Sequence, residues 1–334
     1  MYFFVIIPIL YSCSDSNNEV SDNINQPVDG FEWTVPENTI TGSFNPFPLA
    51  IDPTFRNASE IDFIAEESLV AMINFNEEIK VYPYQYLNRF ESVNDKLSGR
   101  NYALTYCPIT RSALCWDRDF KNNSMVLRAS GYLLHDNLVA HDSNSDTYWS
   151  QIGAECIKGK YAGQTNKTYN FIETKWKYIK EYFPNALVFT NSSIANKSEI
   201  TAKKNTDNVE IGDKVFGIIE KNPNGSTVIY GYTYNMFEEE TKLYTKNILS
   251  KKTIIIGNSN LHYITSFIDD SNSEFTAIED QYPIIMQDDK GNKWNIFGIA
   301  VSGNRQGNQL KSPTNFVALY WAWQAFYDTI IFEE

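Results

Sequence analysis

An internal repeat constrains the fold of this chain more than any other feature of its sequence. Two stretches about 145 residues apart carry Trp and Gly in the same order. They are Trp149, Gly153, Gly159 and Gly163, and then Trp294, Gly298, Gly303 and Gly307. In both stretches a helical pattern follows, over 174–183 and 316–326. A short apolar run then follows each helix, at 186–189 and 329–332. Because the matches form a series in register, we expect two diverged copies of one unit.

A pattern of short strands indicates the fold class. Runs of β-branched and aromatic residues, such as 102–106, 113–117 and 253–256, are separated by Gly, Asn, Asp and Pro, as in strands joined by tight turns. We therefore predict an α+β, β-rich fold of two pseudo-symmetric tandem units of short strands, each closed by one amphipathic helix. The parts are a first unit at 45–190, a polar connection at 191–213 and a second unit at 214–334.

The N-terminus has the features of a lipoprotein signal. Its apolar run, at 3–10, is too short to cross a bilayer as a helix, which takes about 20 residues. The run ends in Leu10-Tyr11-Ser12-Cys13, which resembles the lipobox of bacterial lipoproteins, where the Cys is acylated. We expect a signal peptide and lipobox at 1–13 and a tether with an N-terminal arm at 14–44. Lipidation of Cys13 then anchors the protein to a membrane of the cell envelope, on its periplasmic or extracellular face. The alternative is an ordinary buried N-terminal strand.

Composition and charge exclude some classes of function. Hydrophobic residues make up 43% of the chain and aromatic residues 15%, which is too much for a disordered protein. The formal net charge is -13 and the Lys and Arg are scattered, whereas binding to nucleic-acid phosphates needs a basic surface. We therefore expect no nucleic-acid partner. The sequence also lacks a Gly-rich phosphate loop, a zinc-protease motif and a Gly-flanked nucleophilic Ser.

Residues that occur in one copy alone are the candidates for chemistry, because both copies keep what the fold needs. Cys107 and Pro108 follow a predicted strand of the first unit, where the second unit has Gly257 and Asn258. If Cys107 caps a helix that begins at Pro108, free backbone N–H groups and the helix dipole lower the pKa of the thiol, and Thr110 can donate a hydrogen bond to it. Cys107 is then a catalytic nucleophile or a ligand. The alternative is a buried thiol in a tight turn, since free Cys is among the most buried residue types.

Two histidines are weak candidates for a metal site. His135 and His141 are six residues apart on an extended segment, so they point to the same side, where the candidate nucleophile completes a metal site or a thiolate–imidazole pair. Surface or hydrogen-bonded roles are the alternative. Cys115 and Cys156 lie on apolar segments, where we expect core positions or a disulfide. His262 has no partner nearby in the sequence and is assigned no role.

A series of short motifs resembles one known family. They are Ala50-Ile51-Asp52-Pro53-Thr54-Phe55, Val81-Tyr82-Pro83, Val93-Asn94-Asp95, Thr105-Tyr106-Cys107-Pro108, Trp116-Asp117-Arg118, Asn137-Leu138-Val139, Asp142 and Trp149-Ser150-Gln151. Over 51–332 the chain is similar to the domain of unknown function 3179 family. The resemblance implies an exported or membrane-anchored protein, and it brings no assigned activity.

The resemblance bears on individual residues. It implies that Cys107, Asp142 and Gln151 belong to the family pattern. Two positions depart from that pattern, because Arg111 stands where members usually have Gly, and Ser143 where they have Arg. The first departure leaves the geometry of the turn after the thiol open. Where the two candidate His stand, members usually have Asn or Tyr, which argues against a metal site common to the family.

Two functions remain open at this point. The first is an envelope enzyme or redox protein that uses Cys107, with Asn94, Thr110, Asp142 and Gln151 as polar groups around the site. The second is a non-catalytic binding or scaffold lipoprotein for a small molecule, a metal or a partner protein, in which Cys107 is merely packed. The many Tyr and Trp suit such a binding surface. The sequence specifies no cofactor.

Overall fold

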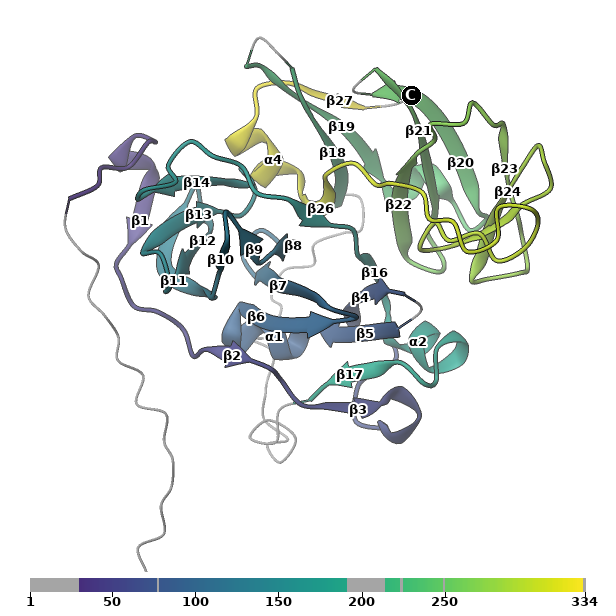
Figure 1. The fold of residues 1–334 in the computed structure, drawn as a ribbon, viewed down its shortest axis with the longest axis horizontal. Helices are drawn as coiled ribbons and strands as arrows, with labels where there is room; N and C mark the ends of the chain where they lie inside the picture. The colour runs from purple at the N-terminus through teal and green to yellow at the C-terminus, as the bar shows by residue number, and fades with distance from the viewer. Residues whose placement is uncertain (1–29, 77, 191–213, 223–224, 249, 333–334) are drawn as a thin grey trace, which may run out of the picture.

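The computed structural model describes residues 30–76, 78–190, 214–222, 225–248 and 250–332 (Figure 1). The predicted signal peptide with Cys13, most of the predicted tether and the connection at 191–213 lie outside these residues. Within the described part strands dominate, and the three α-helices are short: α1 (Tyr84–Phe90), α2 (Trp176–Tyr182) and α4 (Tyr320–Phe326). This confirms the predicted β-rich α+β fold. None of these helices has the length and apolar character needed to cross a bilayer.

Residues 30–190 form three five-stranded sheets, each named here by a central strand. The β4 sheet has the order β16-β4-β5-β17-β3, with β3 (Phe55–Asn57), β4 (Leu69–Phe75), β5 (Glu78–Pro83), β16 (Ile172–Lys175) and β17 (Leu187–Phe189). The β7 sheet has the order β15-β8-β7-β6-β2, with β2 (Ala50–Ile51), β6 (Ser92–Leu97), β7 (Arg100–Cys107), β8 (Ser112–Asp117) and β15 (Thr168–Tyr169). The β12 sheet has the order β1-β11-β12-β13-β14, with β1 (Ile40–Gly42), β11 (Leu127–Leu134), β12 (Asn137–Asp142), β13 (Thr147–Ser150) and β14 (Glu155–Lys158). Strands β9 (Asp119–Phe120) and β10 (Asn123–Ser124) pair with each other.

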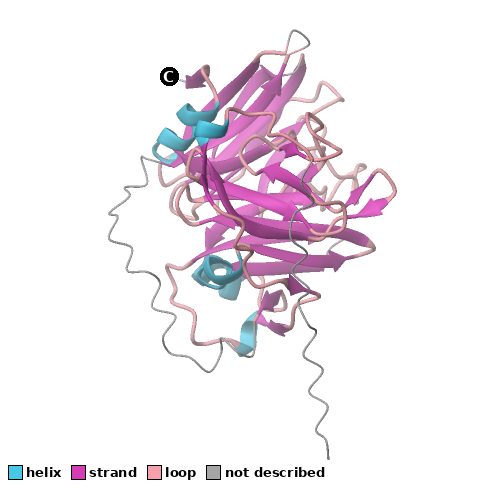
Figure 2. Ribbon diagram, turned by 90° about the vertical axis from the view of Figure 1, so that its left-hand side faces the viewer, coloured by secondary structure: helices cyan, strands magenta, loops and turns pink. Residues whose placement is uncertain are grey.

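Residues 214–332 form three smaller sheets. The β18 sheet has the order β26-β18-β19-β27, with β18 (Lys214–Lys221), β19 (Thr227–Thr233), β26 (Asn315–Leu319) and β27 (Ile330–Phe332). The β21 sheet consists of β20 (Lys242–Ile248), β21 (Lys251–Asn258) and β22 (Tyr263–Ile268), and the β24 sheet of β23 (Phe275–Ala277), β24 (Ile284–Asp288) and β25 (Lys293–Asn295). Short 3-10 helices occur at η1 (Glu37–Thr39), η2 (Ala58–Glu60) and η4 (Tyr234–Phe237). Figure 2 shows the strands filling the body and the helices lying at its periphery.

The predicted strands at 102–106, 113–117 and 253–256 are confirmed as parts of β7, β8 and β21. The predicted second helix is wrong at its start, because Asn315–Leu319 forms β26 and pairs with β18 along its whole length. Sheet pairing thus overrides the helical spacing of the apolar residues there. The first unit also contains a helix that the sequence pattern did not predict, α1.

One continuous apolar core joins the two halves of the described chain. Its largest members are the fully buried indoles of Trp116, Trp149, Trp176, Trp294 and Trp323. Hydrogen bonds also cross between the halves: the Leu319 N–H donates to the Thr110 carbonyl at 2.9 Å, and the Thr174 hydroxyl donates to the Leu261 carbonyl at 2.8 Å. The β18 sheet therefore meets the β7 sheet at the first contact, and the β21 sheet meets the β4 sheet at the second.

Candidate functional site

Cys107 ends a strand and begins a β-hairpin turn. It pairs with Ser112, the first residue of β8, so that 108–111 forms the loop of the β7–β8 hairpin. The expected helix at Pro108 is therefore wrong, and no helix dipole acts on the thiol. Arg111 closes the loop with a φ of 53°, in the left-handed region that favours Gly. This backbone conformation explains why Gly suits position 111, where the present chain has Arg.

The Cys107 thiol is enclosed by protein. Its residue is 1% exposed, and Sγ lies 3.7 Å from the carbonyl oxygen of Asp136, to which it donates a weak hydrogen bond. Burial raises the pKa of the thiol, and the hydrogen bonds from Thr110 only partly oppose that rise. Of the two alternatives for this residue, the lowered pKa is thus wrong and the buried thiol in a tight turn fits the structure. Cys115 and Cys156 are also buried and free, so the predicted core positions hold and these two cysteines form no disulfide here.

Two of the predicted polar residues, Thr110 and Gln151, meet in a buried hydrogen-bond network. The Asn137 amide donates to the Thr110 hydroxyl at 2.9 Å, the Ser112 hydroxyl at 3.0 Å and the Gln151 Oε1 at 2.9 Å. Ser112 Oγ donates to Gln151 Oε1 at 2.6 Å, and Gln151 Nε2 donates to the Thr105 hydroxyl at 3.0 Å. Because these donors and acceptors are used by one another in a water-excluded interior, the network ties β7, β8 and β12 together rather than facing a substrate.

The other two predicted polar residues, Asn94 and Asp142, hold one peptide segment from its two sides. The Asn94 side chain donates to the Leu127 carbonyl at 2.7 Å and accepts from the Leu127 N–H at 2.8 Å. Asp142 Oδ1 accepts from the Val126 N–H at 2.8 Å. Both side chains are buried. Asn94 and Asp142 therefore fix the start of β11 and do not join Cys107.

The histidines point to different partners. The His135 ring packs edge-on against Phe326 at 5.3 Å, whereas His141 Nε2 lies 2.8 Å from Asp146 Oδ1. Burial lowers the pKa of His141, which favours its neutral form. Among the residues that the structure describes, no group of three or more metal-ligating side chains comes together.

The sequence analysis missed a buried ionic cluster between the two halves. Glu173 Oε1 accepts hydrogen bonds from Lys214 Nζ at 2.7 Å and from the Tyr234 hydroxyl at 3.3 Å, and it lies 3.3 Å from His262 Nε2. Burial by itself raises the pKa of Glu173, but Lys214 and His262 outweigh it and lower the pKa to about 2. The local sequence carries little signal, because Glu173 follows one apolar residue of β16, Ile172, and precedes the polar Thr174 and Lys175. Its partners lie far along the chain, so the cluster itself was not predictable.

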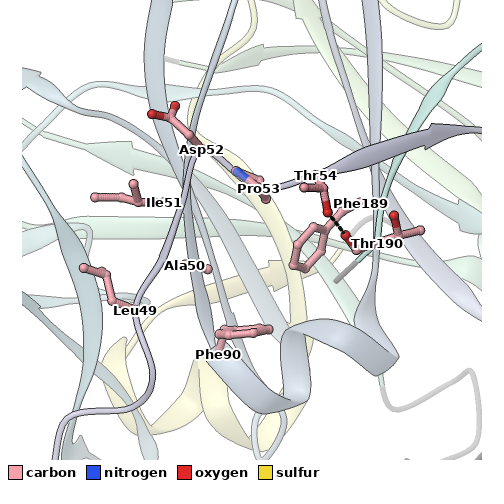
Figure 3. A pocket seen from close by; sticks show the side chains of 9 residues that line it. All are labelled: Leu49, Ala50, Ile51, Asp52, Pro53, Thr54, Phe90, Phe189 and Thr190. Carbon is pink, nitrogen blue, oxygen red and sulfur yellow. Dashed lines mark hydrogen bonds between the residues drawn. The ribbon is translucent and has the colours of Figure 1, made fainter. Parts of the chain in front are cut away.

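A pocket of about 220 Å³ lies elsewhere, at the meeting point of the β4 and β7 sheets (Figure 3). It is lined by Leu49, Ala50, Ile51, Asp52, Pro53, Thr54, Phe90, Phe189 and Thr190. Figure 3 shows the side chains of Ala50, Phe90 and Phe189 near one another, and the Phe90 and Phe189 rings pack edge-on at a centroid distance of 6.1 Å. The surface that lines the pocket is more polar than apolar: Asp52 and Thr54 are exposed at its rim, whereas Ala50, Phe90 and Phe189 are buried behind it.

Hydrogen bonds fix the wall of this pocket. The Asn94 amide donates to the Ala50 carbonyl at 3.1 Å, and the Asp52 N–H donates to the Asn94 carbonyl at 3.0 Å. The Thr54 hydroxyl donates to the Thr190 carbonyl across the far side. Asn94 is therefore the one predicted polar residue that supports the pocket. The wall itself is formed by Ala50 to Thr54, which belong to one of the family motifs.

The chain belongs to the DUF3179 family, a family of proteins of unknown function, whose model matches residues 45–330. This confirms the family that the sequence motifs indicated. No similar protein was found among curated proteins or among solved structures.

Proposed function

We propose that this protein is a non-catalytic binding protein of the cell envelope that holds a small group, with both an apolar and a polar side, in the pocket lined by Ala50, Asp52, Phe90 and Phe189. The observation that carries the proposal is the contrast between two places in the first unit. The predicted nucleophile, Cys107, is enclosed and its pKa is raised, while the Ala50 pocket is open and its floor is aromatic. A buried neutral thiol is a poor nucleophile, and an open hollow with a fixed wall is a suitable binding site.

The volume of the pocket limits the ligand. Drug-sized ligands and cofactors occupy roughly 300–1,000 Å³, whereas an apolar cavity of about 150 Å³ holds benzene. At about 220 Å³ the pocket suits one aromatic ring, an indole or the end of a short acyl chain. Phe90 and Phe189, which are 5% and 1% exposed, offer only a small apolar area to such a group, and the exposed Asp52 and Thr54 offer polar atoms beside it.

Calorimetric titration with indole and with hexanoate tests this proposal. Ala50→Leu adds carbon atoms that project into the hollow, so we expect it to weaken binding at least about tenfold, which corresponds to about 1.4 kcal/mol. The matched control is Ala65→Leu, the same substitution at an exposed loop position, which should bind as the unsubstituted protein does. Equal binding by the two variants, or no saturable binding of either probe, would contradict the proposal.

We also propose that Cys13 is acylated and holds the protein on the membrane. The support is the apolar run and the lipobox-like Leu10-Tyr11-Ser12-Cys13, followed by a polar stretch rich in Asn, Asp and Ser. Cys13→Ser should move the protein from the membrane fraction to the soluble fraction. A variant that still sediments with membranes would show that another anchor exists.

The two units are proposed to be copies of one ancestral unit. Strand order supports this, because β16-β4-β5-β17 and β26-β18-β19-β27 have the same pairing senses, with α2 and α4 at corresponding places in the chain. The hairpin loops after β7 and β21 also end alike, at Arg111 and His262, with φ values of 53° and 52°. In a superposition of 69–189 on 215–332 we expect Trp149 to fall on Trp294. Strand pairs out of register there would contradict the duplication.

A further inference from the structure

The outer edges of the β4 and β18 sheets differ. In the β4 sheet, β17 lies parallel to β5 and its other edge is covered by β3, which pairs with it antiparallel. In the β18 sheet, β27 lies parallel to β19, and among the described strands it is the last one. Figure 1 shows β27 beside β19 at the border of the molecule. A strand edge without a partner presents backbone N–H and C=O groups that can pair with another strand.

The register of the two sheets identifies corresponding residues. Leu187 pairs with Lys80, three residues before Pro83 at the end of β5. Ile331 pairs with Tyr230, three residues before Thr233 at the end of β19. Leu187 and Ile331 are 38% and 40% exposed. They differ in what lies on their outer side. Leu187 is paired with Asn57 of β3, whereas Ile331 has no further described strand beside it.

The helices that precede these two strands also differ: α2, before β17, exposes charged residues, and α4, before β27, exposes uncharged ones. The exposed positions of α2 include Lys180 and Glu181, whereas α4 exposes Gln324 and Ala325 at the corresponding places. The α4–β27 surface comprises Tyr320, Trp321, Gln324, Ala325, Ile331 and Phe332. None of these six residues is charged, and one exposed carboxylate, Asp328, lies in the segment that joins α4 to β27. Tyr320 and Trp321 are 38% and 42% exposed, and the Tyr320 and Phe332 rings lie 5.3 Å apart. Exposed aromatic residues beside an open strand edge are typical of a protein interface.

We propose that the α4–β27 surface is the interface of a homodimer, in which the β27 strands of two copies pair antiparallel across a two-fold axis. A two-fold axis brings the same strand from both copies together in antiparallel orientation, the orientation in which β3 covers β17. Charge also favours a second copy at this place. Two chains of net charge -13 repel each other, and they can approach most easily at a surface with few charges, such as this one with Asp328 at its border.

The pairing on β17 predicts the register of the dimer. The Ala58 N–H donates to the Ala186 carbonyl at 2.9 Å, and the Thr190 N–H donates to the Thr54 carbonyl at 2.9 Å. Because alternate residues of a strand bond to the same neighbour, Leu187 does not bond to β3. By correspondence, Ile330 and Phe332 exchange hydrogen bonds between copies, and the two Ile331 residues face each other as a non-hydrogen-bonded pair. The Cα atoms of such a pair are about 4.5 Å apart, within the range that a disulfide can bridge.

Oxidative cross-linking of Ile331→Cys in the full chain tests the dimer. Cys107, Cys115 and Cys156 are buried, and the unsubstituted chain gives the background from Cys13. We expect more than about half of the Ile331→Cys chains to migrate at twice the chain mass. Leu187→Cys is the matched control, with equal exposure on a covered edge, and it should stay at the background. Cross-linking of neither variant, or of both alike, would overturn the proposal.

Sedimentation equilibrium provides a second readout that needs no oxidation. The unsubstituted chain, of 38.4 kDa, should sediment as a dimer, and Ile331→Lys should sediment as a monomer with an unchanged melting temperature. Leu187→Lys should remain a dimer. A monomeric unsubstituted chain would overturn the proposal.

Discussion

Cys107 shows how the surroundings of a residue decide its chemistry. The thiol is enclosed at the end of β7, and burial raises its pKa, so we expect no reaction with the thiol reagent DTNB in the folded protein at pH 8. Denaturation in guanidinium should release the reactivity of all three buried cysteines. Ile109→Cys provides the matched control, because position 109 lies in the same turn and is 49% exposed, so it should react at once. A Cys107 that reacts in the folded state, with a pH midpoint below about 8.5, would restore the nucleophile hypothesis.

Residues with long-range partners were the ones that the sequence did not predict. Cys107-Pro108 has the local signature of a helix start, yet the pairing of Cys107 with Ser112 makes it a hairpin turn. His262 received no role, because its partner Glu173 is 89 residues away in the chain. Local chemistry was predictable at these positions, whereas the partner of each side chain is set by tertiary packing.

At the scale of elements, the contact between β16 and the second half of the chain depends on an ion pair with its charges buried. Glu173 lies in β16 and meets Lys214 at the start of β18 and His262 before β22, and the Tyr234 ring stacks on His262 at 4.2 Å. Removing one partner of a buried pair leaves the other charge without compensation, which costs about 3–5 kcal/mol. Glu173→Gln should therefore lower the free energy of unfolding strongly at pH 7, as measured by urea denaturation.

The same cluster has a predictable pH dependence. The pKa of Glu173 is lowered to about 2 from 4.5, so the folded state binds fewer protons than the unfolded state in this window. Its contribution to stability is complete above pH 4.5 and is lost as the pH falls toward 2, and Glu173→Gln should remove this fall. Glu67 is the control, because its pKa is also lowered to about 2, by Lys175 and Lys177, but on the surface. If Glu67→Gln destabilises the protein as much as Glu173→Gln at pH 7, burial of the pair is not the cause.

Secondary structure was predicted correctly where it follows from the residues of the segment itself, and incorrectly where pairing with another strand determines it. Strands β7, β8 and β21 follow from runs of β-branched and aromatic residues, and they were predicted. Phe316 to Leu319 has helical spacing but forms β26, because pairing with β18 satisfies its backbone. The pocket could not be predicted, since its lining comes from three separate places in the chain, at 49–54, 90 and 189–190. The motif Ala50 to Phe55 was the one available signal, and it carried no chemistry of its own.

At the scale of the whole molecule, the two halves share one core but differ in what they expose. The first half holds the Ala50 pocket, whose wall is fixed by Asn94 and whose floor is formed by Phe90 and Phe189. The second half exposes the α4–β27 surface, where β27 is the edge strand of the β18 sheet. Binding of a small group and association of two copies are thus assigned to separate places, so each can be removed by substitution without the other.

We propose the pocket, and not the thiol, as the functional site. The most direct test is the rise in melting temperature that indole causes in the unsubstituted protein, in Ala50→Leu and in Cys107→Ala. A ligand that binds the folded state raises the melting temperature by mass action. We predict equal rises for the unsubstituted protein and Cys107→Ala, and no rise for Ala50→Leu. A rise that persists in Ala50→Leu and disappears in Cys107→Ala would contradict the account.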